Sequence, residues 1–442
     1  MRELALREPG KVSMYVCGPT VYDVPHIGHG RFTLVWDVLR RYLEWRGFEV
    51  HYVSNITDIE DKIIRRSNES GIAPDEIVRT YEKAWWDAMD RLGVRHPDDE
   101  PHATAYVDQM VDYISGLIDG GVAYETSDGV YFEVSKLPDY GLLARQSLDS
   151  LRTGAGDRDV VGAEEKRSPL DFALWKKAKP GEPTWPSPWG DGRPGWHIEC
   201  TVMSLDLLGE GFDLHGGGND LAFPHHENER AQALGAGHPF ARHWVHNGMV
   251  VAEGGEEMHK SLGNFVNLTD LLDKVDGRAY RLLVLQSHYR SPMQVTDATL
   301  DRAVNTLEGL DAFGRRFADV APSAALLDVV DRFVELLDDD FNTPPATALI
   351  FDLVRDANKA SDSGDRQTAH TSAATAFELL RVFGLPVGGP VDDVDEATAA
   401  LIAARNLARS EKNFAEADRI RDELQELGWT VEDGPDGTTV HR

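Results

Sequence analysis

The first 54 residues restrict the fold more than any other part of this 442-residue sequence. Residues 11–17 are apolar enough to form a buried strand, which Gly18-Pro19 ends. From about residue 30 to 46 apolar side chains recur at helical spacing, and residues 48–54 then alternate as a second strand. A strand, a helix and another strand in this order begin a parallel sheet covered by helices. We therefore expect an α/β fold with a Rossmann-type, doubly wound parallel sheet.

The rest of the chain divides by pattern into further segments. Helices are predicted near 74–92 and 103–120, a hairpin over 122–134, and another helix that opens at Pro224. The strands of the sheet resume near 212–215 and 244–246, and from about residue 268 the chain is mostly helical before a small terminal β unit. The expected domains are a split sheet domain over 1–120 and 195–265, an insertion over 121–194, and C-terminal parts over 266–300, 301–388 and 394–442.

Charge and cysteine content limit the class of protein. The net charge of −30 argues, taken alone, against nucleic-acid binding, although it leaves room for a local basic surface. Two distant cysteines suit ligand or core roles in a reducing compartment better than a disulfide framework. No apolar run reaches the roughly 18 to 20 residues of a membrane span, and the N-terminus lacks a secretory pattern. We expect a cytoplasmic protein with no membrane partner.

The tetrapeptide His26-Ile27-Gly28-His29 stands between the first predicted strand and helix. A helix N-terminus offers free N–H groups and partial positive charge, which suit phosphates, and histidines can add hydrogen bonds. Gly28 lets a ligand approach the backbone. Alternatively, the segment is only a helix cap with incidental histidines.

Half of a metal site is suggested by His225 and Glu229, which are four residues apart and share one helix face. Two distant ligands must complete such a site, and Cys17 and Cys200 are the two cysteines of the chain. Two thiolates, an imidazole and a carboxylate form a sound zinc set. By spacing alone His226 can replace His225, and a polar surface helix with two buried cysteines explains the pattern equally well.

Two further segments can contact a nucleotide or an amino acid. The loop Glu257-Met258-His259-Lys260-Ser261 can clamp a triphosphate through its lysine, or it is simply a polar loop. The run from His215 to Asp220, which contains Gly217, can hold a flat ring on its backbone and pair Asp220 with an ammonium group, or it is a flexible turn. Trp196 can wall a small pocket or belong to the core.

Together these motifs resemble the cysteinyl-tRNA synthetases, within the class I aminoacyl-tRNA synthetases. The resemblance runs from about Glu8 to Arg442. It is most specific in residues 15–29, 55–62, 195–200 and 215–229, and the C-terminal segments 338–344 and 417–422 also look like the family.

The resemblance implies roles for individual residues. The family's zinc ligands match Cys17, Cys200, His225 and Glu229, and not His226. Residues of the cysteine pocket match Thr57, Trp196 and Asp220. The ATP motifs match His26, Gly28 and His29, together with Gly217 and the loop of Lys260 and Ser261. The C-terminal helical bundle and terminal unit are expected to bind the anticodon stem and loop, with Arg409, Asp418 and Asp433 at positions that contact anticodon bases.

The implied reaction joins L-cysteine to tRNA-Cys at the expense of ATP with Mg²⁺, by a monomeric enzyme that carries one Zn²⁺ per chain. The cysteine carboxylate attacks the α-phosphate, and a terminal ribose hydroxyl of the tRNA then takes the acyl group. Zinc explains selectivity, because it binds a thiolate at about 2.3 Å whereas serine's hydroxyl is a poorer ligand. Losing a specific polar partner can cost about 10⁴-fold, so no editing domain is expected.

One departure from the family pattern bears on activity. The family usually has Lys-Met-Ser-Lys-Ser where this chain has Glu257-Met258-His259-Lys260-Ser261, so a charge near the phosphates is reversed. A weakened paralogue that binds tRNA or cysteine is therefore an alternative. Another is the cysteine ligase of mycothiol synthesis, which shares zinc and adenylation but lacks the full C-terminal region.

Overall fold

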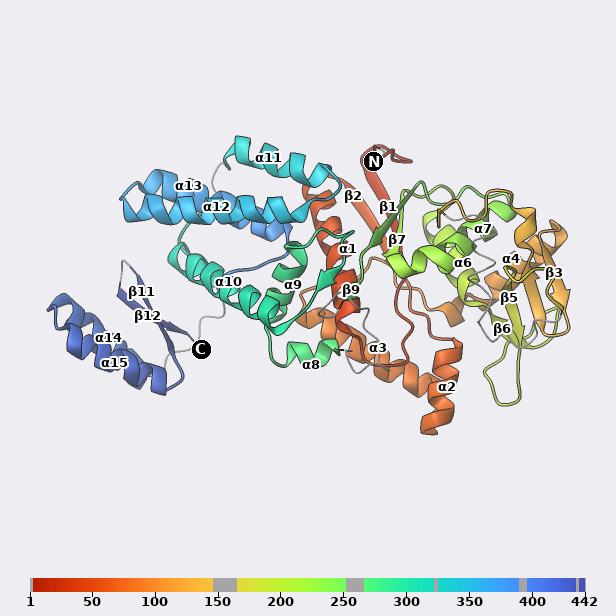
Figure 1. The fold of residues 1–442 in the computed structure, drawn as a ribbon, viewed down its shortest axis with the longest axis horizontal. Coiled ribbons are helices and arrows are strands. Elements are labelled where there is room, and N and C mark those ends of the chain that lie inside the picture. The colour runs from red at the N-terminus through yellow and green to blue at the C-terminus, as the bar shows by residue number, and fades with distance from the viewer. Residues whose placement is uncertain are drawn as a thin grey trace. The chain divides into compact units, whose positions relative to one another are not determined.

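The computed structural model describes residues 3–145, 165–251, 266–321, 325–388, 396–434 and 437–441. They form two compact units. Unit 1 contains Met1–Leu300 together with Leu337–Pro344 and Val382–Gly384, and unit 2 contains Asp301–Leu336, Pro345–Arg381 and Leu385–Arg442. Figure 1 shows the fold, and each unit is described by itself.

The centre of unit 1 is a four-stranded parallel sheet with the order β2-β1-β7-β8. Its strands are β1 (Lys11–Val16), β2 (Glu49–Ser54), β7 (Leu214–Gly218) and β8 (His243–Asn247). Helix α1 (Ile27–Trp45) connects β1 to β2. The predicted doubly wound parallel sheet is confirmed, and the order of its strands brings the early and late parts of the sequence together at β1 and β7.

Alternation along β1 decides which side chains face which layer. Val12, Met14 and Val16 pack with Trp36 and Leu43 of α1 on one side of the sheet. Tyr15 points to the opposite side, into the larger core that also contains residues of α6 (Trp196–Leu208). Figure 1 shows α1 on one side of these strands and α6 with α7 (Glu227–Gly235) on the other. Cys17 follows the parity of Tyr15 and joins the α6 side.

The predicted insertion contains an antiparallel sheet with the order β3-β4-β5-β6. Its strands are β3 (Ala123–Thr126), β4 (Gly129–Phe132), β5 (Phe172–Lys177) and β6 (Gly192–Pro194). The hairpin predicted over 122–134 is therefore confirmed. Strand β6 runs directly into α6, so this sheet fixes where the helix of Cys200 begins.

Further α-helices of unit 1 are α2 (Asp61–Ser70), α3 (Pro74–Arg91), α4 (Val107–Asp119), α8 (Leu268–Leu272) and α9 (Gly277–Leu285). A short parallel pair joins β9 (Val250–Val251) to β10 (Met293–Gln294). Later elements are α10 (Asp297–Arg316), α11 (Leu327–Asp338), α12 (Thr343–Asp362), α13 (Arg366–Val382), α14 (Glu396–Ser410), α15 (Phe414–Glu426), β11 (Thr430–Gly434) and β12 (Gly437–His441). The predicted helical C-terminal half with a small terminal β unit is confirmed.

Some sequence predictions are wrong in detail. Helix α1 begins at Ile27, inside the histidine motif, and not near residue 30. The helix predicted to open at Pro224 does so, because Phe223 just before it is the non-helical residue, and its first turn is π-type and runs into α7, which begins at Glu227. The glycine run after Leu214 is not a flexible turn: it continues β7 to Gly218 and pairs with β8. None of the helices within the described ranges is long and apolar enough to cross a membrane.

Candidate active site and metal centre

Four potential metal ligands converge beside the parallel sheet. Cys17 follows β1, Cys200 lies on α6, His225 precedes α7 and Glu229 lies within α7. Their ligand atoms all lie within 4.8 Å of one another, and each residue is at most 4% exposed. The sequence-predicted set is therefore brought together in one buried cluster that can hold a metal ion.

The contacts inside the cluster show how the donors are aimed. The Cys17 Sγ lies 3.4 Å from Glu229 Oε1, and His225 Nε2 lies 3.1 Å from the same oxygen. The i, i+4 pair predicted from spacing thus shares one face, although the turn before α7 is irregular. Three donor types point at one volume.

A layer of other histidines surrounds these donors. His215 Nε2 lies 2.7 Å from the second oxygen of Glu229, and His197 Nδ1 lies 2.9 Å from His225 Nδ1. Contacts of this kind fix the carboxylate and leave His225 Nε2 facing the cluster. His226 instead contacts His246 through Nδ1 at 2.8 Å.

A second set of donors shares two members with the first. Cys17 and Glu229 also lie within 4.8 Å of ligand atoms from His215 and His226. That set contains one thiol, whereas the first contains two. The alternative ligand His226, which spacing left open, is therefore close to the cluster, and the choice between the sets passes to chemistry.

Burial controls the protonation of the donors. Desolvation raises the pKa of the Cys17 thiol well above its usual value and also raises the pKa of Cys200. Desolvation lowers the pKa of His225 far below its usual value, so its imidazole is neutral, which is the form that binds metals. The two thiols are thus protonated while no cation is bound, and a bound cation would convert them to thiolates.

The predicted cysteine pocket is partly connected to the cluster. Thr57 is buried and its hydroxyl donates to Glu199, the neighbour of Cys200, at 3.0 Å. The half-buried Trp196 ring lies 4.2 Å from the His225 ring, centroid to centroid. Asn55 links these residues, because its amide donates to Thr57 while its oxygen lies 3.6 Å from the Cys200 sulfur. Asp220 is exposed, on the short turn after β7.

The glycines of β7 lie where neighbouring atoms leave no space for a side chain. A Cβ on Gly216 would lie 1.9 Å from the Trp36 ring, so α1 packs directly on this strand. A Cβ on Gly217 would lie 2.8 Å from Leu221 and 3.0 Å from His226. The run is therefore required by close packing, and at Gly217 that packing is against the residues beside the cluster.

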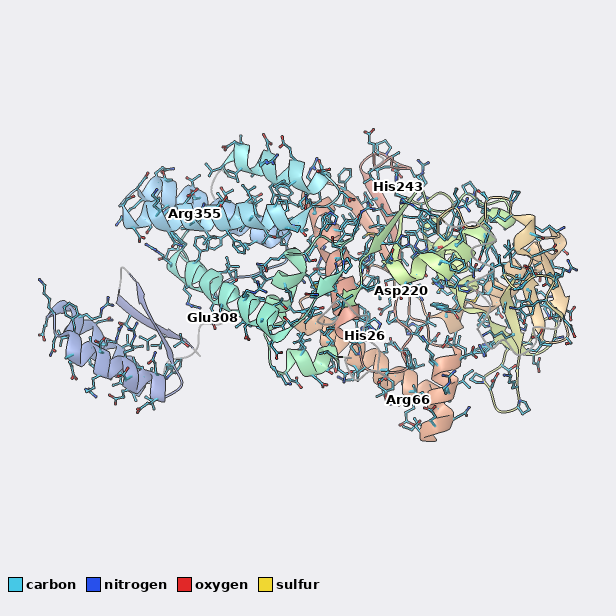
Figure 2. The ribbon with its side chains drawn as sticks, in the orientation of Figure 1. His26, Arg66, Asp220, His243, Glu308 and Arg355 are labelled. Carbon is cyan, nitrogen blue, oxygen red and sulfur yellow. The ribbon has the colours of Figure 1, made fainter. Side chains whose placement is uncertain are left out.

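The histidine motif forms the N-terminus of α1. His26 is the N-cap, its backbone N–H donates to His29 Nδ1 at 3.3 Å, and the two rings stack with centroids 3.7 Å apart. Desolvation, reinforced by His26 and Lys62, lowers the pKa of His29 well below its usual value. A Cβ on Gly28 would lie 2.9 Å from the His26 ring. Figure 2 marks His26 here and Asp220 after β7.

The stretch after the lysine loop is tied to the same motif. Ile27 donates its backbone N–H to Val266 at 3.2 Å, and Leu268 donates to Pro25 at 2.9 Å. Lys260, Ser261 and Glu257 themselves lie outside the described residues. The helix-cap reading and the phosphate reading of the motif are compatible, because a capped N-terminus still presents backbone N–H groups.

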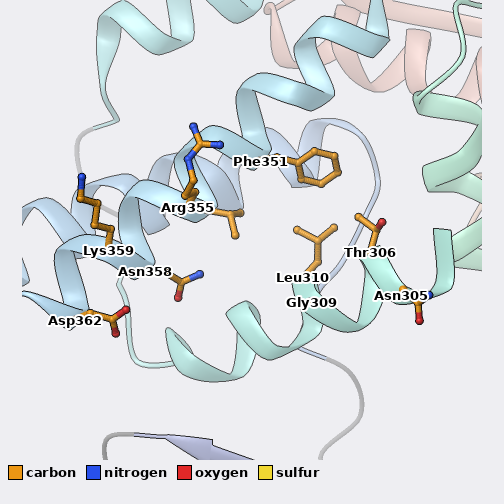
Figure 3. Close-up of a pocket in the computed structure, with 10 residues that line it drawn as sticks. Asn305, Thr306, Gly309, Leu310, Phe351, Arg355, Asn358, Lys359 and Asp362 are labelled. Atoms are coloured by element: carbon orange, nitrogen blue, oxygen red, sulfur yellow. The ribbon is translucent and has the colours of Figure 1, made fainter. Parts of the chain in front are cut away.

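The predicted anticodon residues lie in the C-terminal part of unit 2. Arg409 is in the last turn of α14, Asp418 is exposed on α15, and Asp433 is on β11. A groove of about 650 Å³ elsewhere in unit 2 lies between α10 and α12, as Figure 3 shows. None of the residues that line it in the described chain is a cysteine or histidine, so it is not the metal centre.

Several residues of the site have no individual sequence signal. His197, His246 and Asn55 support the donors from neighbouring elements, yet each is a single polar residue in a strand, a helix or a loop. Their contacts distinguish them, and these contacts are visible only in the fold. His197 and Asn55 do fall in the segments 195–200 and 55–62 that carry the family resemblance, whereas His246 falls in none of them.

Comparison with family models covers almost the whole chain. Residues 3–305 match tRNA synthetases class I (C) catalytic domain, residues 332–387 match the DALR domain, and residues 391–440 match the Cysteinyl-tRNA ligase anticodon binding domain. The chain is 48% identical to a cysteine--tRNA ligase of Halorhodospira halophila, over 98% of this chain and 96% of the relative. A cysteine--tRNA ligase of Thermotoga maritima is 45% identical, over 98% and 95%.

Solved structures agree on the fold. A methionyl-tRNA synthetase of Mycobacterium tuberculosis in complex with methionyl-adenylate superposes with a TM-score of 0.65 at 15% identity, covering 92% of this chain and 96% of that one. A leucyl enzyme, the LeuRS of Agrobacterium radiobacter in a ternary complex, gives 0.64 at 13% identity, covering 86% and 84%. With the near-complete sequence match, these findings identify the chain as a member of the cysteinyl-tRNA synthetase family of class I aminoacyl-tRNA synthetases.

Proposed function

We propose that the chain is a cysteine--tRNA ligase, which activates L-cysteine with ATP and transfers it to tRNA-Cys. The observation that carries the proposal is the buried cluster of Cys17, Cys200, His225 and Glu229 beside the Trp196 ring. A cluster of thiols next to a small aromatic wall suits an amino acid whose side chain is itself a thiol. The family membership supplies the reaction.

Zinc is the metal that this donor set fits best. Two thiols, one imidazole and one carboxylate are borderline-soft donors, whereas magnesium and calcium prefer oxygen ligands throughout. This chemistry also favours the set with Cys200 and His225 over the set with His215 and His226, because the first offers a second sulfur. When bound, zinc supplies an electrophilic position that takes a thiolate in preference to a hydroxyl. We propose one zinc ion per chain.

The protein's own groups position the reactants. We assign Thr57, Trp196 and Asp220 to the cysteine pocket, where the exposed carboxylate of Asp220 suits the ammonium group of the substrate. His26, Gly28 and His29 present the N-terminus of α1 to the triphosphate, and Gly217, Lys260 and Ser261 belong to the same nucleotide site. Magnesium accompanies ATP as a part of that substrate.

The chemistry follows from this placement. The cysteine carboxylate attacks the α-phosphate of ATP in line, the bond to pyrophosphate breaks, and cysteinyl-adenylate forms. A terminal ribose hydroxyl of tRNA-Cys then attacks the acyl carbon and releases AMP. His29 is held neutral by burial, so it can donate a hydrogen bond to the phosphates without carrying a fixed charge. The chain contributes positioning and electrostatic stabilisation and forms no covalent bond to the substrate.

The C-terminal half carries the RNA part of the proposal. We assign residues 266–300 to contact with the tRNA stem and 301–388 and 394–442 to the anticodon side, with Arg409, Asp418 and Asp433 at the anticodon bases. The match to an anticodon binding domain over residues 391–440 supports this assignment. We further propose a monomer that works in the cytoplasm, where thiols stay reduced and available as ligands.

The test is cysteine-dependent ATP–pyrophosphate exchange, followed by charging of tRNA-Cys. Both activities are expected, with serine at least about 10⁴-fold poorer than cysteine in exchange. Exchange without charging would point to a ligase that uses a small-molecule acceptor, and tRNA binding without either activity would point to an inactive paralogue. The variant Glu257→Lys restores the charge usual in the family, and we expect it to raise the exchange rate several-fold.

A further inference from the structure

The turn between α11 and α12 has a motif that the proposed reaction does not use. Its sequence is Asp338-Asp339-Asp340-Phe341, and the turn belongs to unit 1 although the helices on either side lie mainly in unit 2. The first and third aspartates have partners within unit 1. The second, Asp339, is exposed and makes no side-chain hydrogen bond or ion pair with another described residue.

Asp338 holds the C-terminal end of α1. Its carboxylate accepts a hydrogen bond from the Tyr42 hydroxyl at 2.6 Å and from the Arg46 guanidinium at 2.7 and 2.8 Å. Tyr42 and Arg46 are four residues apart and also contact each other at 2.7 Å. The loop between α11 and α12 is therefore hydrogen-bonded to one face of the C-terminal end of α1. The first residues of the same helix are the histidine motif.

Asp340 holds a second tyrosine–arginine pair in a matching way. It accepts a hydrogen bond from the Tyr289 hydroxyl at 2.9 Å and from the Arg290 guanidinium at 2.6 Å. The Phe341 ring lies between the two tyrosines, 6.2 Å from the ring of Tyr42 and 6.3 Å from that of Tyr289. The same loop thus contacts the end of α1 and the 288–291 segment, which are far apart in the sequence.

The backbone of the turn is strained in order to make these contacts. Asp340 and Phe341 have φ values of 58° and 54°, so two consecutive non-glycine residues are left-handed. Each such residue costs about 1 to 2 kcal/mol and persists only where the surroundings hold it. A connection between two helices does not need this conformation, which indicates that the contacts of the turn matter more than its own stability.

The end of α1 and the 288–291 segment are both connected to the proposed nucleotide site. Arg31, one turn after His26 on α1, is buried and donates to the carbonyls of Met249 at 2.9 Å and Tyr289 at 3.2 Å. A Cβ on Gly248 would lie 2.4 Å from the Ser291 carbonyl, so the Tyr289 segment packs tightly on the strand that precedes the lysine loop. Moving the 288–291 segment therefore displaces the carbonyl groups that hold Arg31 and, with it, the first turns of α1.

We propose that Asp338 and Asp340 are positioning residues of the ATP site: through Tyr42, Arg46, Tyr289 and Arg290 they fix α1 and the 288–291 segment against each other. The proposal rests on the proposed function for its activity readout. Positioning errors of about 1 Å far from the chemistry can cost about 10²-fold in rate. Loss of the Asp338 and Asp340 contacts can therefore slow the activation of cysteine by ATP.

The test compares the double variant Asp338→Asn/Asp340→Asn with Asp339→Asn, which removes the same charge from the same turn. The affinity for a non-hydrolysable ATP analogue is measured by calorimetry, and kcat/KM for ATP and KM for cysteine are measured in exchange. We expect the double variant to lose about tenfold or more in analogue affinity and in kcat/KM for ATP. KM for cysteine and zinc content should change by less than about twofold, and Asp339→Asn should resemble the parent.

Several results would overturn the proposal. One is a folded double variant with the ATP affinity of Asp339→Asn, and another is an equal loss for ATP and cysteine, which a general loss of structure would produce. If the double variant does not fold, Tyr42→Phe/Tyr289→Phe removes two of the hydrogen bonds, keeps the ion pairs and should weaken analogue binding several-fold. A parent without exchange would contradict the proposed function, while analogue affinity would still test the role of Asp338 and Asp340.

Discussion

The proposed metal cluster of Cys17, Cys200, His225 and Glu229 and the proposed nucleotide turn of residues 26–29 both lie in unit 1, but they are built in opposite ways. The cluster is made of side chains from three separate segments, each side chain at most 4% exposed, and further histidines contact His225 and Glu229. The turn at His26 is made of consecutive residues at a helix N-terminus, is only half-buried, and is tied to residues 266–268 by main-chain hydrogen bonds. The cluster depends on tertiary packing, whereas the turn depends on local backbone geometry.

This difference predicts how each region fails. When Cys17 or Glu229 is lost, neither donor set of the cluster stays complete, because both sets contain these two residues. A helix N-terminus has several backbone N–H groups, so the loss of one side chain leaves part of its function. Substitutions in the cluster should therefore have larger effects than substitutions in the turn.

The largest effect is expected for Cys17→Ser. The hydroxyl is a poorer ligand for zinc than the thiolate, and Cys17 belongs to both donor sets of the cluster. We expect zinc content to fall from one per chain to near zero and cysteine-dependent exchange to fall by more than about 10³-fold, or ~4 kcal/mol. Metal analysis by mass spectrometry and the exchange assay measure the two quantities. Ser204→Ala, a buried change on α6 outside the donor set, serves as control, and a zinc-free but active Cys17→Ser protein would refute the role of the cluster.

The two regions were also predictable to different degrees. The turn at His26 could be placed because its residues are contiguous and follow a strand, although α1 begins at Ile27 and not near residue 30, and its role in nucleotide binding stays a prediction. The donors of the cluster could be guessed as a set, but nothing in their spacing separated His225 from His226. The fold brings both histidines close to Cys17 and Glu229, and they differ in that the set with His225 includes Cys200 whereas His226 also contacts His246.

Elements that lack a regular pattern were harder to predict. Helix α6 is buried over nearly all of residues 197–204, so it has no polar face and no helical periodicity to detect. Helix α2 buries only Ile63 and Ile64, which is too few for a pattern. The supporting layer around the cluster could not be predicted for a related reason, since its members are identified by burial and by contacts across the fold.

The next effect tests the nucleotide turn with two substitutions of His29. Removal of the ring by His29→Ala takes away a donor to the phosphates and should lower kcat of exchange by about 10²-fold. His29→Asn keeps an acceptor for the His26 N–H, so it separates capping from phosphate binding. We expect His29→Asn to restore thermal stability but not the rate. Full activity in His29→Asn would show that His29 only caps the helix.

A smaller effect concerns the loss of folding stability at acid pH that is caused by His246, which contacts His226 beside the cluster. Burial, with His215 and Arg290 nearby, lowers the pKa of His246 to about 4 from 6.5. The unfolded chain therefore binds a proton near pH 6.5 that the folded chain resists, so stability is complete above pH 6.5 and is lost as pH falls toward 4. This single group should cost about 2 kcal/mol between pH 6.5 and 5, at ~1.4 kcal/mol per pH unit.

Urea unfolding at pH 7.5 and pH 5 measures that loss. His246→Gln cannot take up a proton, so its stability should fall by about 2 kcal/mol less than the parent's over the same interval. His370→Gln, an exposed change on α13, should leave the parent's pH dependence unaltered. An identical pH dependence in His246→Gln and the parent would mean that His246 is protonated in the folded protein.

The smallest effect probes the supporting layer of the cluster through His215, whose Nε2 lies 2.7 Å from Glu229 Oε2. Because outer partners of metal ligands orient them, His215→Leu should weaken zinc binding by about tenfold, or ~1.4 kcal/mol, in competition with a chelator. His215→Gln places an amide nitrogen near the position of Nε2 and should recover much of the affinity.

If His215→Leu binds zinc as tightly as the parent, the carboxylate is positioned by α7 alone, and the cluster resembles the nucleotide turn in depending on one element. If both variants lose the metal completely, His215 is itself a ligand and the set with His226 is the one that binds.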